Sequence, residues 1–197
     1  MSLFSIALVL FLIMDPLGNI APINTMLTAV EPKRQNWVIL REMLFALGFI
    51  LFFALLGEVL FIFLEINDIT VSIAAGMILF LAAVQILFPS LNSLRLRVPK
   101  EEPYITPLAI PLIAGPALLA TTMLYAKLQH SHIIMLGAVL ISWTLALIIT
   151  LSSRRIHKLI GNNGVLGIEK LMGMVLVLLA TQRFVDGIKL FINKVIS

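Results

Sequence analysis

Between Met14 and Asn24 this chain places residues that could do chemistry inside an otherwise apolar stretch. One carboxylate, two prolines, one glycine and two asparagines fall within these eleven residues. Inside a membrane a carboxylate is costly, each proline removes a backbone donor, and glycine loosens a helix. Asp15 could carry a proton, bind a cation or pair with the amine of a substrate. The alternative is that Asp15 caps a half-helix that starts at Pro16.

The residues that follow this acid extend the candidate site. Gly18 and Asn19 would lie in the first turn of the second half-helix, where free N–H groups and the positive helix dipole favour a carboxylate ligand. Asn24 follows one to two turns later. It either lines the same cavity or hydrogen-bonds to a neighbouring helix.

A second apolar stretch is interrupted in the same way at residues 111–116. Pro111, Gly115 and Pro116 break the helix there, and two threonines downstream supply hydroxyl groups. We predict helix breaks at Pro16, Pro22, Pro111 and Pro116. We predict that the substrate is bound by Asp15, which also takes the coupling ion, and by Gly18, Asn19, Asn24, Gly115, Pro116, Thr121 and Thr122.

The sequence lacks the motifs of common enzymes and metal sites. It contains no G-x-S-x-G, no H-E-x-x-H, no phosphate-binding P-loop and no cysteine. Two histidines in one short loop, His130 and His132, are too few for a metal centre. We therefore expect neither an enzyme nor a bound metal or cofactor.

Composition identifies the elements that must position these residues. The mean hydropathy is +1.09 and only 12% of residues are charged, whereas soluble domains have about 25% charged residues. Several windows of 18 or more residues are almost free of charge, which is long enough for a helix to cross a bilayer. We predict one all-helical transmembrane domain over 1–197, with six spans at about 2–30, 42–64, 69–89, 105–126, 132–152 and 167–188.

The basic residues predict how these spans are oriented. Ten Lys and Arg residues fall in the connections after spans 1, 3 and 5, against four on the other side. Because cytoplasmic loops are enriched in Lys and Arg, this distribution predicts that both termini lie outside the cytoplasm. The net charge of +4 therefore reflects topology, and we expect no nucleic-acid partner.

An internal repeat relates the two interrupted stretches. When the chain is shifted by 97 residues, 76–85 falls on 173–182 with six of ten residues identical, and Gly18 falls on Gly115. Asp15 falls on Leu112, so the acid is not duplicated. Each half, about 1–97 and 98–194, contains three spans. The second half would therefore enter the membrane from the opposite face, as in the inverted 3+3 repeats of many secondary transporters.

The repeat also pairs smaller features. Gln85 and Gln182 are secondary site candidates, for which hydrogen bonding between helices is the favoured alternative. We expect Gly76 in span 3 and Gly173 in span 6 to allow close packing against the broken spans 1 and 4. The i, i+3 spacing of Arg183 and Asp186 predicts an ion pair at the surface.

The motifs from Asp15 to Pro22, from Pro107 to Pro116 and from Gly173 to Gln182, with Asp186-Gly187-Ile188, resemble those of the MarC family. The resemblance covers essentially the whole chain. It implies a six-span integral membrane protein, grouped with LysE-type exporters, and transport of small neutral amino acids. Arg183 and Ala117 depart from the family pattern, in which an apolar residue and a second glycine are usual.

We therefore expect a multi-pass inner-membrane transporter coupled to protons or Na⁺, with alanine, glycine or serine bound between broken spans 1 and 4. Its partners would be lipid and a small-molecule substrate, and a homo-oligomer is allowed. The alternatives are an exporter or channel for another small solute or ion, and a membrane scaffold that transports nothing.

Overall fold

A computed structural model describes residues 2–63, 65–88, 102–129 and 131–196. Within these ranges the chain is helical, apart from turns and one isolated bridge between Tyr104 and Thr106. The prediction of an all-helical protein is confirmed. The predicted basic loop that carries Arg95, Arg97 and Lys100 lies outside the described residues.

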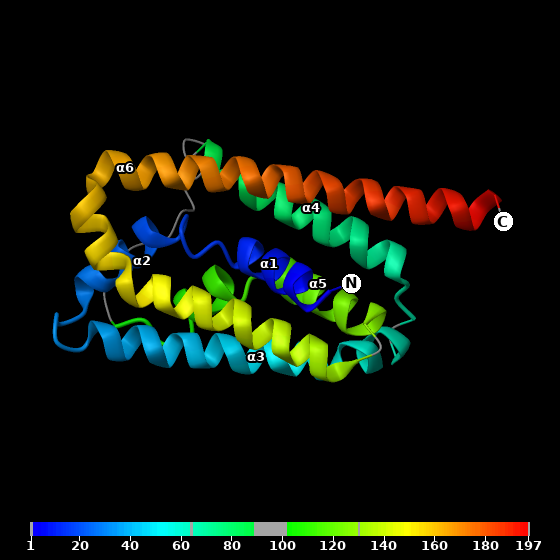
Figure 1. Ribbon diagram of the computed structural model, residues 1–197, viewed down its shortest axis with the longest axis horizontal. Helices are drawn as coiled ribbons and strands as arrows, with labels where there is room; N and C mark the ends of the chain where they lie inside the picture. The colour runs from blue at the N-terminus through cyan, green and yellow to red at the C-terminus, as the bar shows by residue number, and fades with distance from the viewer. Residues whose placement is uncertain (1, 64, 89–101, 130, 197) are drawn as a thin grey trace.

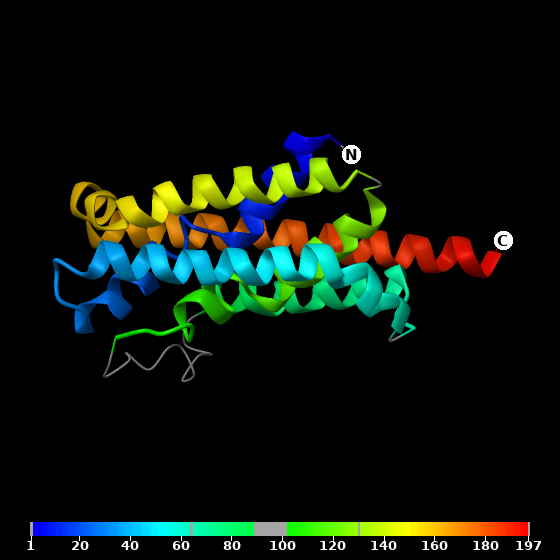
Figure 2. The same cartoon turned by 90° about the horizontal axis from the view of Figure 1, so that it is seen from below.

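The elements follow the predicted order, with different ends (Figures 1 and 2). They are α1 Leu3–Met14, α2 Ile20–Met26, the 3-10 turn η1 Leu27–Ala29, α3 Gln35–Phe63, α4 Asp68–Leu87, the π-type helix η3 Leu108–Ile113, α5 Pro116–Leu128 and α6 His132–Ile196. Segments long and apolar enough to cross a bilayer occur at Gln35–Gly57, Asp68–Leu87 and His132–Lys194.

The α6 element is two helices joined by a sharp reversal. Its 65 residues would measure about 98 Å if straight, at 1.5 Å per residue, roughly three times the thickness of the hydrocarbon core. The helix is broken at Gly161, whose φ of 76° and ψ of 173° suit glycine. The chain turns back on itself there (Figure 1). The predicted connection over 153–166 is therefore helical except at Gly161.

The two broken segments lie inside the bundle. In Figure 1, α1, α2 and α5 lie between α3 on one side and the pair formed by α4 and the second half of α6 on the other. Residues of both broken segments are fully buried, among them Leu10 in α1, Ile20 in α2 and Leu108 in η3. The apolar residues of the outer helices remain exposed where a membrane would cover them, as at Phe63 and Leu178.

Two glycines allow α4 and α6 to pack closely. A Cβ at Gly76 would lie 2.8 Å from the backbone nitrogen of Phe184, and one at Gly173 would lie 2.8 Å from a methyl carbon of Ile86. We expected these glycines to make room for the broken helices, which is wrong. Gly76 makes room for α6, and Gly173 makes room for α4.

Polar side chains anchor the connections that lead into the core. Lys170 Nζ donates to the carbonyls of Ile86 and Leu87 at 2.6 and 2.8 Å, and so binds the end of α4. Arg41 in α3 pairs with Glu102 at 2.9 Å and lies over the ring of Tyr104. The contacts of Arg41 hold the residues that precede η3 against α3.

Candidate functional site between the two breaks

The first break is organised around Asp15. This residue adopts a left-handed conformation, with φ of 46° and ψ of 54°, and ends α1. Its Oδ1 accepts a hydrogen bond from the N–H of Gly18 at 3.0 Å. Asp15 thus closes a turn after α1 and does not cap a half-helix that starts at Pro16, so that alternative is wrong. Residues 16–19 form a turn, and α2 begins at Ile20.

The neighbours of Asp15 complete the turn. A Cβ at Gly18 would lie 2.2 Å from Asp15 Oδ2, so only glycine fits under this carboxylate. Asn19 donates from its N–H to the carbonyl of Asp15 and from its side chain to the carbonyl of Met14, both at 3.0 Å. The N–H groups of Gly18 and Asn19 are thus bonded to Asp15, which corrects our expectation that they bind a substrate carboxylate.

The second break is constructed differently. In η3 the backbone of Ile110 is extended rather than helical, directly before Pro111. Gly115 then caps α5, which begins at Pro116, and no side chain forms a capping hydrogen bond there. The first N–H groups of a helix lack partners within the helix. The N–H groups at the start of α5 can therefore bind a ligand, whereas those of Gly18 and Asn19 at the first break are already bonded to Asp15.

The two breaks line one cavity of about 410 Å³, which we call the break cavity. It joins residues almost 100 positions apart, and α4 and α6 complete its wall. The predicted residues that line it are Asp15, Gly18, Asn19, Pro22, Gln85, Pro111, Gly115 and Pro116. Ala117 and Leu118, in the first turn of α5, line it as well.

The charge in this cavity comes from both halves of the chain. Asp15 is 3% exposed, and its Oδ2 has no hydrogen-bond partner among the described residues. Glu169 of α6 is also buried and lines the same cavity. We expected an acid in the first half only, which is wrong. The position of Glu169 inside the predicted last span, at about 167–188, was the available indication.

Several predicted site residues lie elsewhere. Asn24 binds α6, with its Nδ2 3.4 Å from the carbonyl of Ser153 and 3.2 Å from His157 Nδ1. Thr121 and Thr122 are buried in α5 but do not line the break cavity. Gln182 donates to Asp186 at 2.8 Å within α6 and, among the residues that the structure describes, bonds to no other helix.

The histidine and carboxylate side chains of the described residues form no group of three or more that could hold a metal ion. The break cavity instead combines two buried carboxyl groups, a helix N-terminus and apolar walls. Opposite partial charges on its two sides suit a small ligand that carries both an amine and a carboxylate.

Comparisons with known proteins place the chain in a family. Residues 1–192 match the family described as MarC family integral membrane protein. The chain is 43% identical over 195 residues to the UPF0056 inner membrane protein YhgN of Escherichia coli, covering 97% of this chain and 98% of YhgN. It is 46% identical over 188 residues to the UPF0056 membrane protein BU449 of Buchnera aphidicola, covering 95% and 96%. A relative from Chlamydia pneumoniae is 32% identical over 193 residues, covering 97% and 96%.

No solved structure matches the chain. The family match spans nearly the whole sequence, and the relatives agree with it in length and in being membrane proteins. The chain therefore belongs to the MarC family of integral membrane proteins.

Proposed function

We propose that this protein is a secondary transporter of small neutral amino acids such as alanine, glycine or serine. The observation that carries the proposal is the break cavity, which is lined both by Asp15 and by the N-terminus of α5. Its volume of about 410 Å³ falls within the range of about 300–1,000 Å³ that is usual for small-molecule sites. Broken helices that meet inside a membrane are typical of transporter substrate sites.

The two sides of the cavity match the two charged ends of an amino acid. The substrate carboxylate would bind the N–H groups of Ala117 and Leu118, aided by the dipole of α5. The ammonium group would pair with Asp15 Oδ2. Leu112 and Pro116 narrow the remaining space, which favours small side chains.

Asp15 is also our candidate for the coupling site. Its charge is buried, and Oδ2 has no partner among the described residues, so the carboxylate needs a proton or another cation to compensate it. Binding of H⁺ or Na⁺ at the group that also binds substrate would couple the two movements.

We further propose that the chain crosses the membrane six times as an inverted 3+3 repeat, with both termini outside the cytoplasm. Reciprocal contacts support this arrangement. Gly76 of α4 meets Phe184 of α6, while Gly173 of α6 meets Leu87 of α4, and Leu87 and Phe184 are themselves 97 residues apart. Contacts exchanged in this way fit a two-fold relation between antiparallel helices. The name of the Escherichia coli relative supports an inner-membrane location.

The test is uptake of labelled L-alanine by the purified chain in liposomes, under an imposed pH or Na⁺ gradient. We expect saturable, gradient-driven accumulation, reduced by about 10- to 100-fold in Asp15→Asn, because a hydrogen bond to a charged group contributes about 1.5–3 kcal/mol. Glu31→Gln removes an exposed acid instead and serves as the matched control, with uptake unchanged.

Other results would assign the chain to the alternative classes. Flux that rises without saturation and ignores the gradient would indicate a channel. No flux of any small solute would indicate a scaffold. Normal gradient-driven uptake by Asp15→Asn would reduce the role of the carboxylate to capping the turn.

A further inference from the structure

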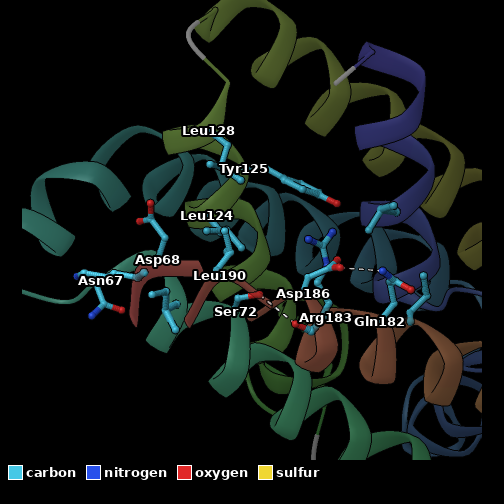
Figure 3. A pocket seen from close by; sticks show the side chains of 14 residues that line it. Asn67, Asp68, Ser72, Leu124, Tyr125, Leu128, Gln182, Arg183, Asp186 and Leu190 are labelled. Atoms are coloured by element: carbon cyan, nitrogen blue, oxygen red, sulfur yellow. Dashed lines mark hydrogen bonds between the residues drawn. The ribbon is translucent and has the colours of Figure 1, made fainter. Parts of the chain in front are cut away.

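A second cavity lies farther along the helices that form the break cavity. It measures about 710 Å³ and is lined by the start of α4, the end of α5 and the last part of α6. Figure 3 shows its polar side chains. We call it the arginine cavity, and its polar lining includes Asp68, Ser72, Tyr125, Gln182, Arg183 and Asp186.

The two cavities use positions that the internal repeat relates. Gln85 lines the break cavity and Gln182 the arginine cavity, and the same holds for Ala82 and Leu179. Arg183 occupies the position that corresponds to Ile86. At these three positions of α6 the arginine cavity thus uses the residues that correspond to the α4 wall of the break cavity, with a cation in place of an apolar side chain.

Arg183 is held in place but is not neutralised by a direct bond. Its guanidinium lies over the ring of buried Tyr125, 4.5 Å from the ring centre, and its carbonyl accepts a hydrogen bond from Ser72. Among the described residues, its N–H groups have no hydrogen bond or ion pair. A guanidinium offers five donors in a planar fork that matches a carboxylate.

The acids of this cavity have their own partners. Asp68 accepts from Lys127 Nζ at 2.7 Å. Asp186 accepts from Gln182 at 2.8 Å, although it is near enough to act on Arg183 electrostatically. The ion pair that the i, i+3 spacing predicted is therefore replaced by a bond to Gln182 (Figure 3). The donors of Arg183 are left available to a ligand.

We propose that the arginine cavity is a second substrate site, at which the substrate carboxylate binds the guanidinium of Arg183. The identity of the ligand as an amino acid rests on the function proposed above, whereas the carboxylate site itself rests on Arg183. The nearby carboxylate of Asp186 is placed to attract the ammonium end of the same ligand.

The two sites are close enough to act in sequence. Along α6, Leu176 lines the break cavity and Leu179 the arginine cavity, and along α1 the corresponding residues are Ile13 and Val9. Spacings of three and four residues correspond to about 5–6 Å of helix. The walls of the two cavities are therefore about one helical turn apart on both α1 and α6.

The chain contains no cysteine, so a single cysteine can be introduced and labelled selectively to test this site. Leu179→Cys places a thiol in the arginine cavity, and Ala82→Cys places one at the repeat-related position of the break cavity. Each purified full-length variant is labelled with two methanethiosulfonate reagents, one carrying a sulfonate and the other a trimethylammonium group. The readout is the ratio of the two labelling rates.

We expect the sulfonate reagent to be favoured at Leu179→Cys and not at Ala82→Cys. Adding Arg183→Gln should lower the ratio at Leu179→Cys by up to about 30-fold. Two charges 4 Å apart interact with about 1 kcal/mol even in water, and the two reagents are affected in opposite senses, so the ratio changes by about 2 kcal/mol. Lys194→Gln removes the same charge from an exposed residue of this cavity and should change the ratio less. Acetate should slow labelling only when Arg183 is present.

An unchanged ratio and unchanged acetate protection in Arg183→Gln would overturn the site, whatever the uptake assay gives. Charge-dependent labelling with acetate protection, in a chain that does not transport alanine, would support the carboxylate site while the proposed function fails. The two proposals can therefore fail separately. Elution of each variant as a single species on gel filtration verifies that it has folded.

Discussion

The two breaks that line the break cavity differ in how they use their hydrogen-bonding groups. At the first, the Asp15 carboxylate binds the N–H of Gly18, and Asn19 binds the end of α1. At the second, Gly115 precedes α5, and no side chain caps that helix. At the first break the polar groups are thus bonded to one another around an acid. At the second break the N–H groups that begin α5 have no side-chain partner.

The two breaks differ in this way although a shift of 97 residues aligns Gly18 with Gly115. Two equivalent breaks would present the same charge twice to a ligand. An acid facing a helix N-terminus presents opposite charges instead, which suits a zwitterion. The comparison predicts that the roles of the two breaks cannot be exchanged.

The largest effect is expected from moving the acid to the other break. In Asp15→Leu combined with Leu112→Asp, we expect alanine uptake to remain about 100-fold below wild type, as for loss of a charged hydrogen bond. Asp15 turns its carboxylate back onto Gly18 from a left-handed backbone, whereas Leu112 lies within η3. The single variant Asp15→Leu serves as the reference. Uptake restored to near wild type would mean that the two breaks are equivalent.

A second comparison concerns the glycines between α4 and α6. Gly76→Ala should destabilise the protein by about 1–3 kcal/mol, because its Cβ would meet the backbone of Phe184 and the helices must separate. Gly173→Ala should cost less than about 1 kcal/mol, because its Cβ would meet side-chain atoms of Ile86 and Leu87, which can rotate. Thermal unfolding in detergent measures both. Equal losses would contradict the asymmetry of this contact.

The closed turn at the first break can be tested at Gly18. An added Cβ would displace the Asp15 carboxylate and its hydrogen bond, so Gly18→Ala should lower alanine uptake about tenfold, with a loss of about 1–2 kcal/mol in stability. Gly48→Ala is the matched control, since its Cβ would meet nothing within 4 Å. That control should be neutral or slightly stabilising, as expected for Gly to Ala in a helix. Full uptake by Gly18→Ala would show that the carboxylate need not stay where it is.

Features that depend on local chemistry could be predicted from the sequence. Proline interrupts a helix unless it lies in the first turn, so the breaks near Pro16 and Pro111 were found. The break predicted at Pro22 is wrong, because Pro22 lies in the first turn of α2, where no N–H is needed for the helix. The lack of charge over long windows indicated a membrane protein. The start of α2 was misplaced because the Asp15 carboxylate and its left-handed backbone convert the expected first helical turn into a turn of another kind.

Contacts between distant parts of the chain could not be predicted in the same way. Glu169 reaches the break cavity only because α6 folds back at Gly161 and packs against α4. Thr121 has a polar side chain in an apolar span, yet the rotation of α5 directs it away from the cavity. Sequence spacing indicates which residues share a helix but not which face of that helix meets a cavity.

The smallest effect is expected at Asn24, which belongs to the first broken segment but lies outside the cavity. Its hydrogen bonds to Ser153 and His157 join α2 to α6 at 3.2 to 3.5 Å, and such bonds within membranes contribute about 0.6 kcal/mol on average. Asn24→Ala should therefore lower the melting temperature slightly and leave alanine uptake unchanged. Asn19→Ala, which removes a buried bond at the edge of the cavity, should reduce uptake as well. Loss of uptake in Asn24→Ala with unchanged stability would return Asn24 to the substrate site, and α2 would then have to rotate during transport.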